Sequence, residues 1–176
     1  MSARTEFSIE PGKPTIVIQR LFDAPRALVW EAVTKPEHVA CWYGFRYSSL
    51  SECRIDLRPG GAWRFVIRMP DGSDHGFGGV YREIVPPGRL SYTSRYDVYP
   101  DAESLETIVL EERKGKTLLT ATVLHTSVEN RDGHVAAGME AGCTELHDRL
   151  AELLASLVVN RAKSVASDTK VRGDES

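Results

Sequence analysis

Regularly spaced turn signals between Tyr47 and Thr126 constrain the fold of this chain more than any other feature. The segments between the signals are too short to hold the helical crossover that joins parallel strands. This stretch therefore predicts six antiparallel strands joined by short turns. The signals are Pro59-Gly60-Gly61, Pro70-Asp71-Gly72, Pro86-Pro87-Gly88, Pro100-Asp101 and Lys114-Gly115-Lys116.

Apolar and polar residues alternate within these segments. Trp63, Phe65 and Ile67 alternate with Arg64 and Arg68, and segments 53–58 and 119–123 show the same period of two. Such alternation is typical of antiparallel strands that are covered on one face and wet on the other. We therefore expect a sheet with a single apolar face.

One strand and two short helices are predicted before this sheet. Residues 15–22 are rich in β-branched side chains and predict a strand. Asp23 is a candidate N-cap and Pro25 suits a first helical turn, so a short helix should follow. Thr34-Lys35-Pro36 repeats this signal and predicts a second short helix that ends near Gly44.

A long amphipathic helix is predicted from about Glu129 to Val159. Its apolar residues recur every three or four positions, which places them on one stripe. Gly138 and Gly142 interrupt the stripe. They allow either close contact with a bulky strand residue such as Trp63 or a place in the wall of a cavity. The stripe makes this helix the natural cover for the apolar face of the sheet.

Length and composition indicate one domain of 176 residues. We expect a flexible N-terminal arm at 1–13, the domain at 14–159, and a polar, disordered tail at 160–176. The net charge is −3 without a basic stripe, so nucleic-acid binding is not expected. No signal peptide or membrane-spanning run is visible, and the three cysteines are widely spaced. These features favour a cytoplasmic protein with reduced thiols.

Several motifs resemble a known superfamily in the expected order between about Thr15 and Leu157. The order of elements is similar to the START-like (SRPBCC) helix-grip superfamily, which includes polyketide cyclases and the birch-pollen allergen. The motifs resemble its branch that is homologous to the C-terminal domain of the activator of the 90-kDa heat-shock chaperone ATPase. They are Phe22-Asp23-Ala24-Pro25, Trp42-Tyr43-Gly44, Asp56-Leu57-Arg58-Pro59-Gly60-Gly61, Gly79-Val80-Tyr81-Arg82-Glu83-Ile84 and Gly115-Lys116-Thr117-Leu118-Leu119-Thr120.

This resemblance implies an α+β helix-grip fold, in which a curved antiparallel sheet of about seven strands surrounds the long C-terminal helix. It also implies that a small apolar or amphipathic molecule binds in a cavity between the sheet and that helix. For each aromatic candidate, packing in an ordinary core is the competing interpretation. The candidate ligand-binding residues are Trp42, Trp63, Phe65, Tyr81, Tyr92, Ile108, Leu110, His125, Met139 and Cys143.

Two other functions are open at this point. The resemblance also suits a chaperone-binding module that activates an ATPase or acts in a stress response, and an enzyme of the cyclase or hydrolase kind. An enzyme is less expected, because His125 is the main acid–base candidate and also fits a histidine at the sheet rim that is hydrogen-bonded to the backbone. A homodimer is compatible with the sequence.

Two further patterns are candidate sites. Glu140, Cys143 and His147 lie near one helical face, which suits a metal site or a Cys–His pair, but no fourth ligand is identifiable. Gly76-x-Gly78-Gly79 precedes a strand rather than a helix, so it indicates a bulge or tight bend instead of dinucleotide binding. No cofactor or metal is predicted.

Overall fold

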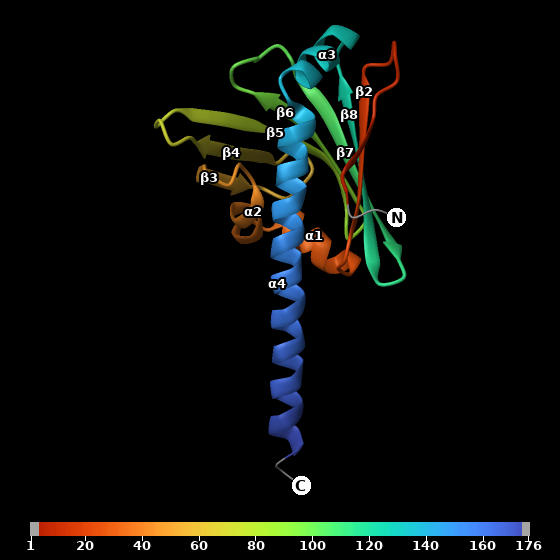
Figure 1. Cartoon of the computed structure of the whole chain (residues 1–176), viewed down its shortest axis with the longest axis vertical. Helices are drawn as coiled ribbons and strands as arrows, with labels where there is room; N and C mark the ends of the chain where they lie inside the picture. Colours follow the sequence, from red (N-terminus) through yellow and green to blue (C-terminus); the bar gives the residue numbers. More distant parts are fainter. Residues whose placement is uncertain (1–3, 174–176) are drawn as a thin grey trace.

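A computed structural model describes residues 4–173, and its eight strands form one curved antiparallel sheet crossed by a long helix (Figure 1). The elements are β1 (Glu6–Ser8), β2 (Thr15–Phe22), α1 (Arg26–Thr34), α2 (Pro36–Trp42), β3 (Ser49–Ile55), β4 (Ala62–Arg68), β5 (Asp74–Val85), β6 (Arg89–Tyr96), β7 (Ser104–Arg113), β8 (Lys116–His125), α3 (Val128–Ala136) and α4 (Met139–Gly173). This is the α+β helix-grip arrangement expected from the sequence.

The sheet confirms the predicted meander. The strand order is β1-β2-β8-β7-β6-β5-β4-β3, so the six strands from β3 to β8 are neighbours in chain order. Strand β2 pairs with β8, with Ile18 opposite Ala121. The first two strands are thereby joined to the last strand of the meander, and the apolar face of the sheet turns toward α1 and α4.

The N-terminal segment contains a strand that the sequence analysis missed. Phe7 pairs with Ile18, so β1 extends the sheet to eight strands instead of about seven. This pairing satisfies backbone groups of β2 that would otherwise form an open edge. Residues 1–3 of the predicted flexible arm lie outside the described residues.

The two short helices are present, but Asp23 is not an N-cap. Helix α1 begins after Pro25, and no side chain caps it. Asp23 lies too early in the chain to reach the first helical turn, and its side chain is 87% exposed. Pro36 occupies the first turn of α2, as predicted.

The predicted C-terminal helix is divided into α3 and α4. Gly138 adopts φ +87° between them, a conformation that glycine reaches without the steric penalty of other residues. Gly142 lies within α4, where a Cβ would be 3.7 Å from the ring of Phe45. Neither of the two glycines therefore packs against Trp63.

Helix α4 also continues past the expected end of the domain, to Gly173. The sequence predicts a polar, disordered tail from residue 160, whereas the helix continues through residues 161–172, which contain neither glycine nor proline to end it. Arg161 Nη2 also donates to Glu31 Oε2 of α1 at 2.8 Å. Residues 174–176 of the predicted tail lie outside the described part of the chain.

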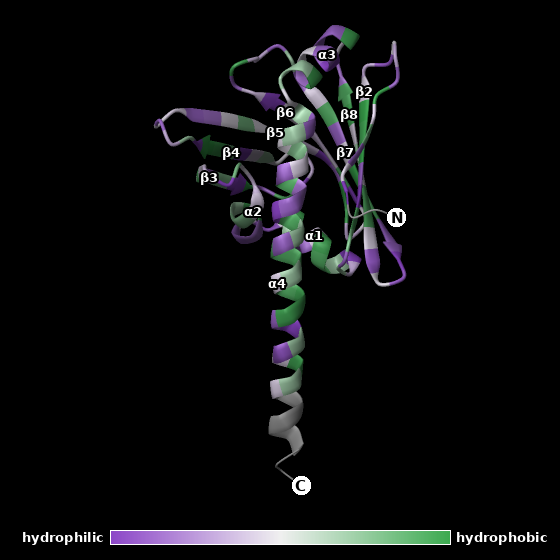
Figure 2. Ribbon diagram, in the orientation of Figure 1, coloured by the Kyte–Doolittle hydropathy of each residue, from purple (hydrophilic) through white to green (hydrophobic). Residues whose placement is uncertain are grey.

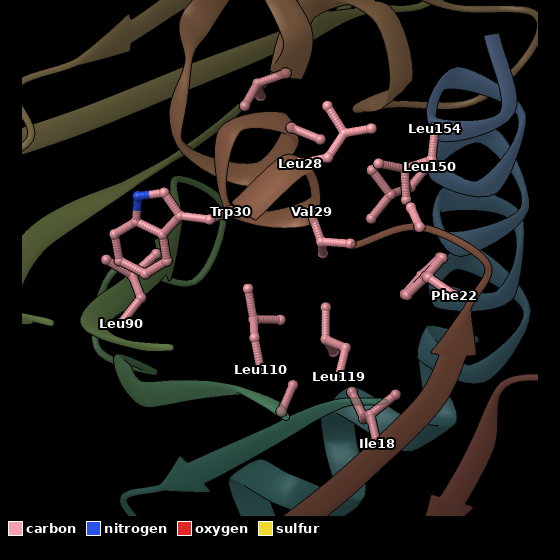
Figure 3. Close-up of a cluster of buried hydrophobic side chains, with 14 of the residues drawn as sticks. Ile18, Phe22, Leu28, Val29, Trp30, Leu90, Leu110, Leu119, Leu150 and Leu154 are labelled. Atoms are coloured by element: carbon pink, nitrogen blue, oxygen red, sulfur yellow. The ribbon is translucent and has the colours of Figure 1, made fainter. Parts of the chain in front are cut away.

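The core fills the space between the sheet, α1 and one face of α4. Val29 of α1 faces Leu119 of the sheet, and Leu28 of α1 lies beside Leu150 of α4 (Figure 3). Hydrophobic and hydrophilic bands alternate along α4, as expected of a helix with one buried face (Figure 2). No helix in the described chain is long and apolar enough to cross a membrane.

Candidate ligand-binding site

Five of the ten predicted ligand-binding residues belong to one network of aromatic contacts: four lie on strands of the sheet, and Trp42 lies at the end of α2. The ring centroids of Trp63 and Phe65 are 4.9 Å apart, and those of Trp63 and Tyr92 are 5.5 Å apart. Tyr81 contacts Tyr92 at 6.0 Å. Tyr43, which was not among the predicted residues, links Phe65 at 4.7 Å to Trp42 at 5.9 Å.

The two indole groups of this cluster already have hydrogen-bond acceptors. Trp63 Nε1 donates to the carbonyl of Thr93 at 2.9 Å, and Trp42 Nε1 donates to the carbonyl of Ala32 at 2.8 Å. Both indoles are thereby oriented by the backbone, and they offer a ligand only their apolar rings.

A carboxyl group lies among these rings. Glu106 of β7 is the direct cross-strand neighbour of Tyr92, and the Tyr92 hydroxyl donates to Glu106 Oε2 at 2.9 Å. Burial raises the pKa of Glu106, although hydrogen bonds from Tyr92 and Ser94 partly oppose this shift. The environment therefore favours the neutral carboxylic acid, which can donate a hydrogen bond.

Tyr43 and Cys143 complete the polar part of this region. Burial is the main cause that raises the pKa of each group, to about 12 for the Cys143 thiol, and the charge of Glu106 adds to both shifts. This electrostatic effect places both groups near Glu106. We refer to Tyr43, Tyr92, Glu106 and Cys143 as the polar cluster.

The polar cluster borders space that solvent can reach. All four residues are only half-buried, although protein surrounds their polar groups closely enough for burial to dominate their pKa shifts. In addition, the Tyr43 hydroxyl makes no hydrogen bond with any residue that the structure describes, and it is not a fully buried atom. A hydroxyl in this state is available to a ligand or to water.

The Cys143–His147 pair lacks the properties of a nucleophile or a metal site. Its Sγ and Nε2 atoms are 3.9 Å apart, but burial lowers the pKa of His147 to about 4, and the pKa of the thiol is raised. Both groups are therefore neutral near pH 7, whereas a reactive cysteine requires the thiolate. Glu140 is exposed, and no three metal-binding side chains cluster within the described residues.

His125 lies apart from the polar cluster, beneath α3. Its Nδ1 hydrogen-bonds to the carbonyl oxygen of Pro14 at 3.2 Å, and its Nε2 lies 3.0 Å from Nδ1 of His134. Burial lowers the pKa of both histidines. The contact with Pro14 agrees with the interpretation of His125 as a rim histidine that is bonded to the backbone.

The remaining predicted residues differ in their exposure. Ile108 is half-buried and follows Glu106 on the same face of β7. Leu110 is fully buried beside Leu119 in the core beneath α1 (Figure 3). Met139 is buried at the start of α4.

Sequence reasoning missed Glu106 and Tyr43, although the alternation contained a signal for the first. Glu106 shares its strand phase with Ile108 and Leu110, so it is a charged residue on an apolar face. A carboxylate in such a position requires a partner or a raised pKa, which marks it as a candidate site residue. Tyr43 had no comparable signal, because it lies where α2 ends.

Comparisons with known proteins support one family. The family model described as "Activator of Hsp90 ATPase homolog 1-like protein" matches residues 23–155. No curated protein matches the chain significantly.

Several solved structures are similar over most of their length. A protein from Rhodobacter sphaeroides is 28% identical, with 87% of this chain and 99% of that chain covered and a TM-score of 0.81. One from Nitrosomonas europaea is 28% identical, with 86% and 99% covered and a TM-score of 0.76. A protein from Aeromonas hydrophila described as AHSA1-like shares the fold at 20% identity, with 81% and 93% covered and a TM-score of 0.67. The chain therefore belongs to the Activator of Hsp90 ATPase homolog 1-like family and has its SRPBCC fold.

Proposed function

We propose that this protein binds a small, uncharged amphipathic molecule between the sheet and α4, without chemical conversion. The observation that carries this proposal is the unpartnered, accessible hydroxyl of Tyr43 beside the Glu106–Tyr92 pair. Binding sites for small molecules commonly combine apolar walls with a few polar groups that fix the orientation of the ligand. Here the rings of Trp63 and Phe65 supply the walls, and Tyr43 and Glu106 supply the polar contacts.

An uncharged polar group suits this site better than an anion. Burial raises the pKa of Glu106 and of both tyrosines, so the site already disfavours negative charge. Among the residues that the structure describes, no cation contributes to lowering the pKa of Glu106. A ligand hydroxyl, carbonyl or amide would exchange hydrogen bonds with Tyr43 and with Glu106.

Native mass spectrometry of the purified protein is the first test, with the denatured mass as the reference. A bound small molecule would identify the ligand class. Tyr43→Phe removes one hydroxyl and keeps the ring contacts, so it should weaken binding of that molecule about 3- to 10-fold. Tyr99→Phe is the matched control, because Tyr99 is 61% exposed and lies in the β6–β7 connection.

Two results together would refute this function. They are a ligand-free native mass and no shift of the melting temperature with any member of a library of uncharged lipids and aromatic compounds. Equal weakening by Tyr43→Phe and Tyr99→Phe would place the ligand outside the polar cluster.

The family description supports a second candidate, an interaction with the 90-kDa chaperone. A pull-down with the purified chaperone and an assay of its ATPase rate test this candidate directly. Co-purification with a raised ATPase rate would support it, and neither effect at equimolar protein would remove it.

A further inference from the structure

A hollow lies between the end of β2, the start of β8 and the middle of α4. Its volume is about 430 Å³, within the usual range of small-molecule sites. Phe22 lies between β2 and α4, close to Leu150 and Leu154 (Figure 3). The hollow is lined by Arg20, Leu21, Phe22, Asp23, Lys116, Ala151, Leu154, Ala155 and Val158.

The two sides of this hollow differ in chemistry. The α4 side contributes only apolar residues, from Ala151 to Val158. The strand side contributes two cations, Arg20 and Lys116. Each cation has an acidic neighbour: Asp148 Oδ1 lies 2.6 Å from Arg20 Nη1, and Asp23, which is 87% exposed, lies 3.9 Å from Lys116. These acids offset the net charge, but Arg20 keeps a donor without an acceptor. The combination suits a molecule with an apolar body and one anionic group.

Arg20 is the distinctive residue of the hollow. Its side chain is only 7% exposed and belongs to the inward-facing set of β2, which otherwise holds Ile16, Ile18 and Phe22. Nη1 donates to Asp148 Oδ1 at 2.6 Å and to Thr5 Oγ1 at 3.3 Å. The guanidinium carbon also lies 5.4 Å from the centroid of the Phe22 ring. These contacts hold the group in one orientation.

The other edge of the same guanidinium has no acceptor among the described residues. Nε is fully buried without a hydrogen bond, and Nη2 makes none although it is not fully buried. Leaving a buried donor unsatisfied costs about 1–3 kcal/mol, so such an atom requires an explanation. The Nε and Nη2 protons point in parallel, which is the geometry that accepts the two oxygens of one carboxylate.

We propose that this hollow binds a carboxylate with an apolar tail, with its two oxygens on the Nε–Nη2 edge of Arg20 and its tail against α4. Nη2 provides the first contact, and a small movement of the side chains around Arg20 brings Nε within reach. Lys116 attracts the anion at the rim. The site shares no residue with the polar cluster, but it is a neighbour of that cluster, because the charge of Arg20 partly opposes the raised pKa of Cys143. Variants specific to each site therefore have to distinguish the two.

Decanoate is a suitable probe, with decanol as the uncharged control of equal chain length. The readout is the Nε–H resonance of Arg20 in a ¹H–¹⁵N spectrum, assigned by its loss in Arg20→Lys. Decanoate should move this resonance in a saturable manner, because a charged acceptor would replace the absent partner. Decanol should move it little and bind at least about 10-fold more weakly, since a charge-assisted bidentate pair is stronger than a neutral contact.

Two variants locate the site without disturbing Arg20. Ala155→Phe places a ring in the hollow from an exposed position of α4, so the helix should fold normally and affinity should fall at least about 10-fold. Ser156→Phe adds the same ring at the next exposed residue, which does not line the hollow, and should leave affinity unchanged. Arg20→Lys keeps the charge but lacks the planar edge, so it should also bind at least about 10-fold more weakly.

An unmoved Arg20 resonance at saturating decanoate would overturn the proposal, and so would equal affinity of Ala155→Phe and the parent protein. Binding of decanoate that Tyr43→Phe weakens and Ala155→Phe does not would place this ligand at the polar cluster instead. If Ala155→Phe loses decanoate binding and Tyr43→Phe keeps it, the Arg20 site is supported, whether or not the polar cluster binds a ligand of its own.

Discussion

The substitution Glu106→Gln tests whether the polar cluster holds a neutral carboxylic acid. Burial raises the pKa of Glu106 above its ordinary value of 4.5. At a pH between 4.5 and the raised pKa of folded Glu106, the side chain has lost its proton in the unfolded chain and retains it in the folded chain. The folded state then binds one more proton than the unfolded state, so the free energy of unfolding falls as pH rises.

The raised pKa of Glu106 fixes the sign of this effect. The slope is about −1.4 kcal/mol per pH unit, and it acts from pH 4.5 up to the pKa of folded Glu106. Glutamine has no proton to lose and can still accept the bond that Tyr92 donates at 2.9 Å. The Glu106→Gln variant should therefore match the parent protein near pH 4 and be more stable than it at pH 8.

Urea unfolding at half-unit steps from pH 4 to pH 8 measures this difference. Glu112→Gln is the matched control, because Glu112 is exposed at the end of the same strand. The reasoning would be refuted if the advantage of Glu106→Gln did not grow with pH, or if it grew equally in Glu112→Gln. A carboxyl titration of Glu106 by ¹³C NMR that gave a pKa below 4.5 would refute it independently.

Two further predictions concern stability. Gly79→Ala should lower the free energy of unfolding by at least about 2 kcal/mol, because the added Cβ would overlap the Thr93 carbonyl. Gly133→Ala on α3 should raise the free energy of unfolding by about 0.5–1 kcal/mol, because no atom lies within 4 Å of the added Cβ and alanine favours the helix. Urea unfolding of both variants at pH 7 checks this, and equal effects would contradict it. Burial lowers the pKa of His147 from 6.5 to about 4. The contribution of this neutral side chain to the free energy of unfolding is therefore complete above pH 6.5, and about 3 kcal/mol of it is lost as the pH falls from 6.5 to 4. His147→Gln should lose less stability than the parent protein over that interval in the same assay, and parallel pH curves would show that His147 is not buried in its neutral form.

The secondary structure was largely predictable because its causes are local. Turn residues and alternation predicted β3 to β8, and each predicted turn lies between two of these strands. Strand β1 was not predicted, because three residues are too few to show an alternating pattern and form a strand only by pairing with β2. The break at Gly138 escaped because the apolar stripe continues across it, although the chain there adopts a positive φ.

The sequence by itself determined the antiparallel meander, its single apolar face and the family resemblance, since period, turn chemistry and motifs depend on neighbouring residues. The tertiary structure alone decided what two charged residues on that apolar face do. Neither Arg20 nor Glu106 was singled out in the sequence analysis, and their hydrogen-bond partners come from other elements of the fold: Asp148 of α4 for Arg20, and Tyr92 of β6 for Glu106. Burial strengthens electrostatic interactions and penalises unpaired charge, so the fold around each residue determines whether it is ionised, paired or available to a ligand.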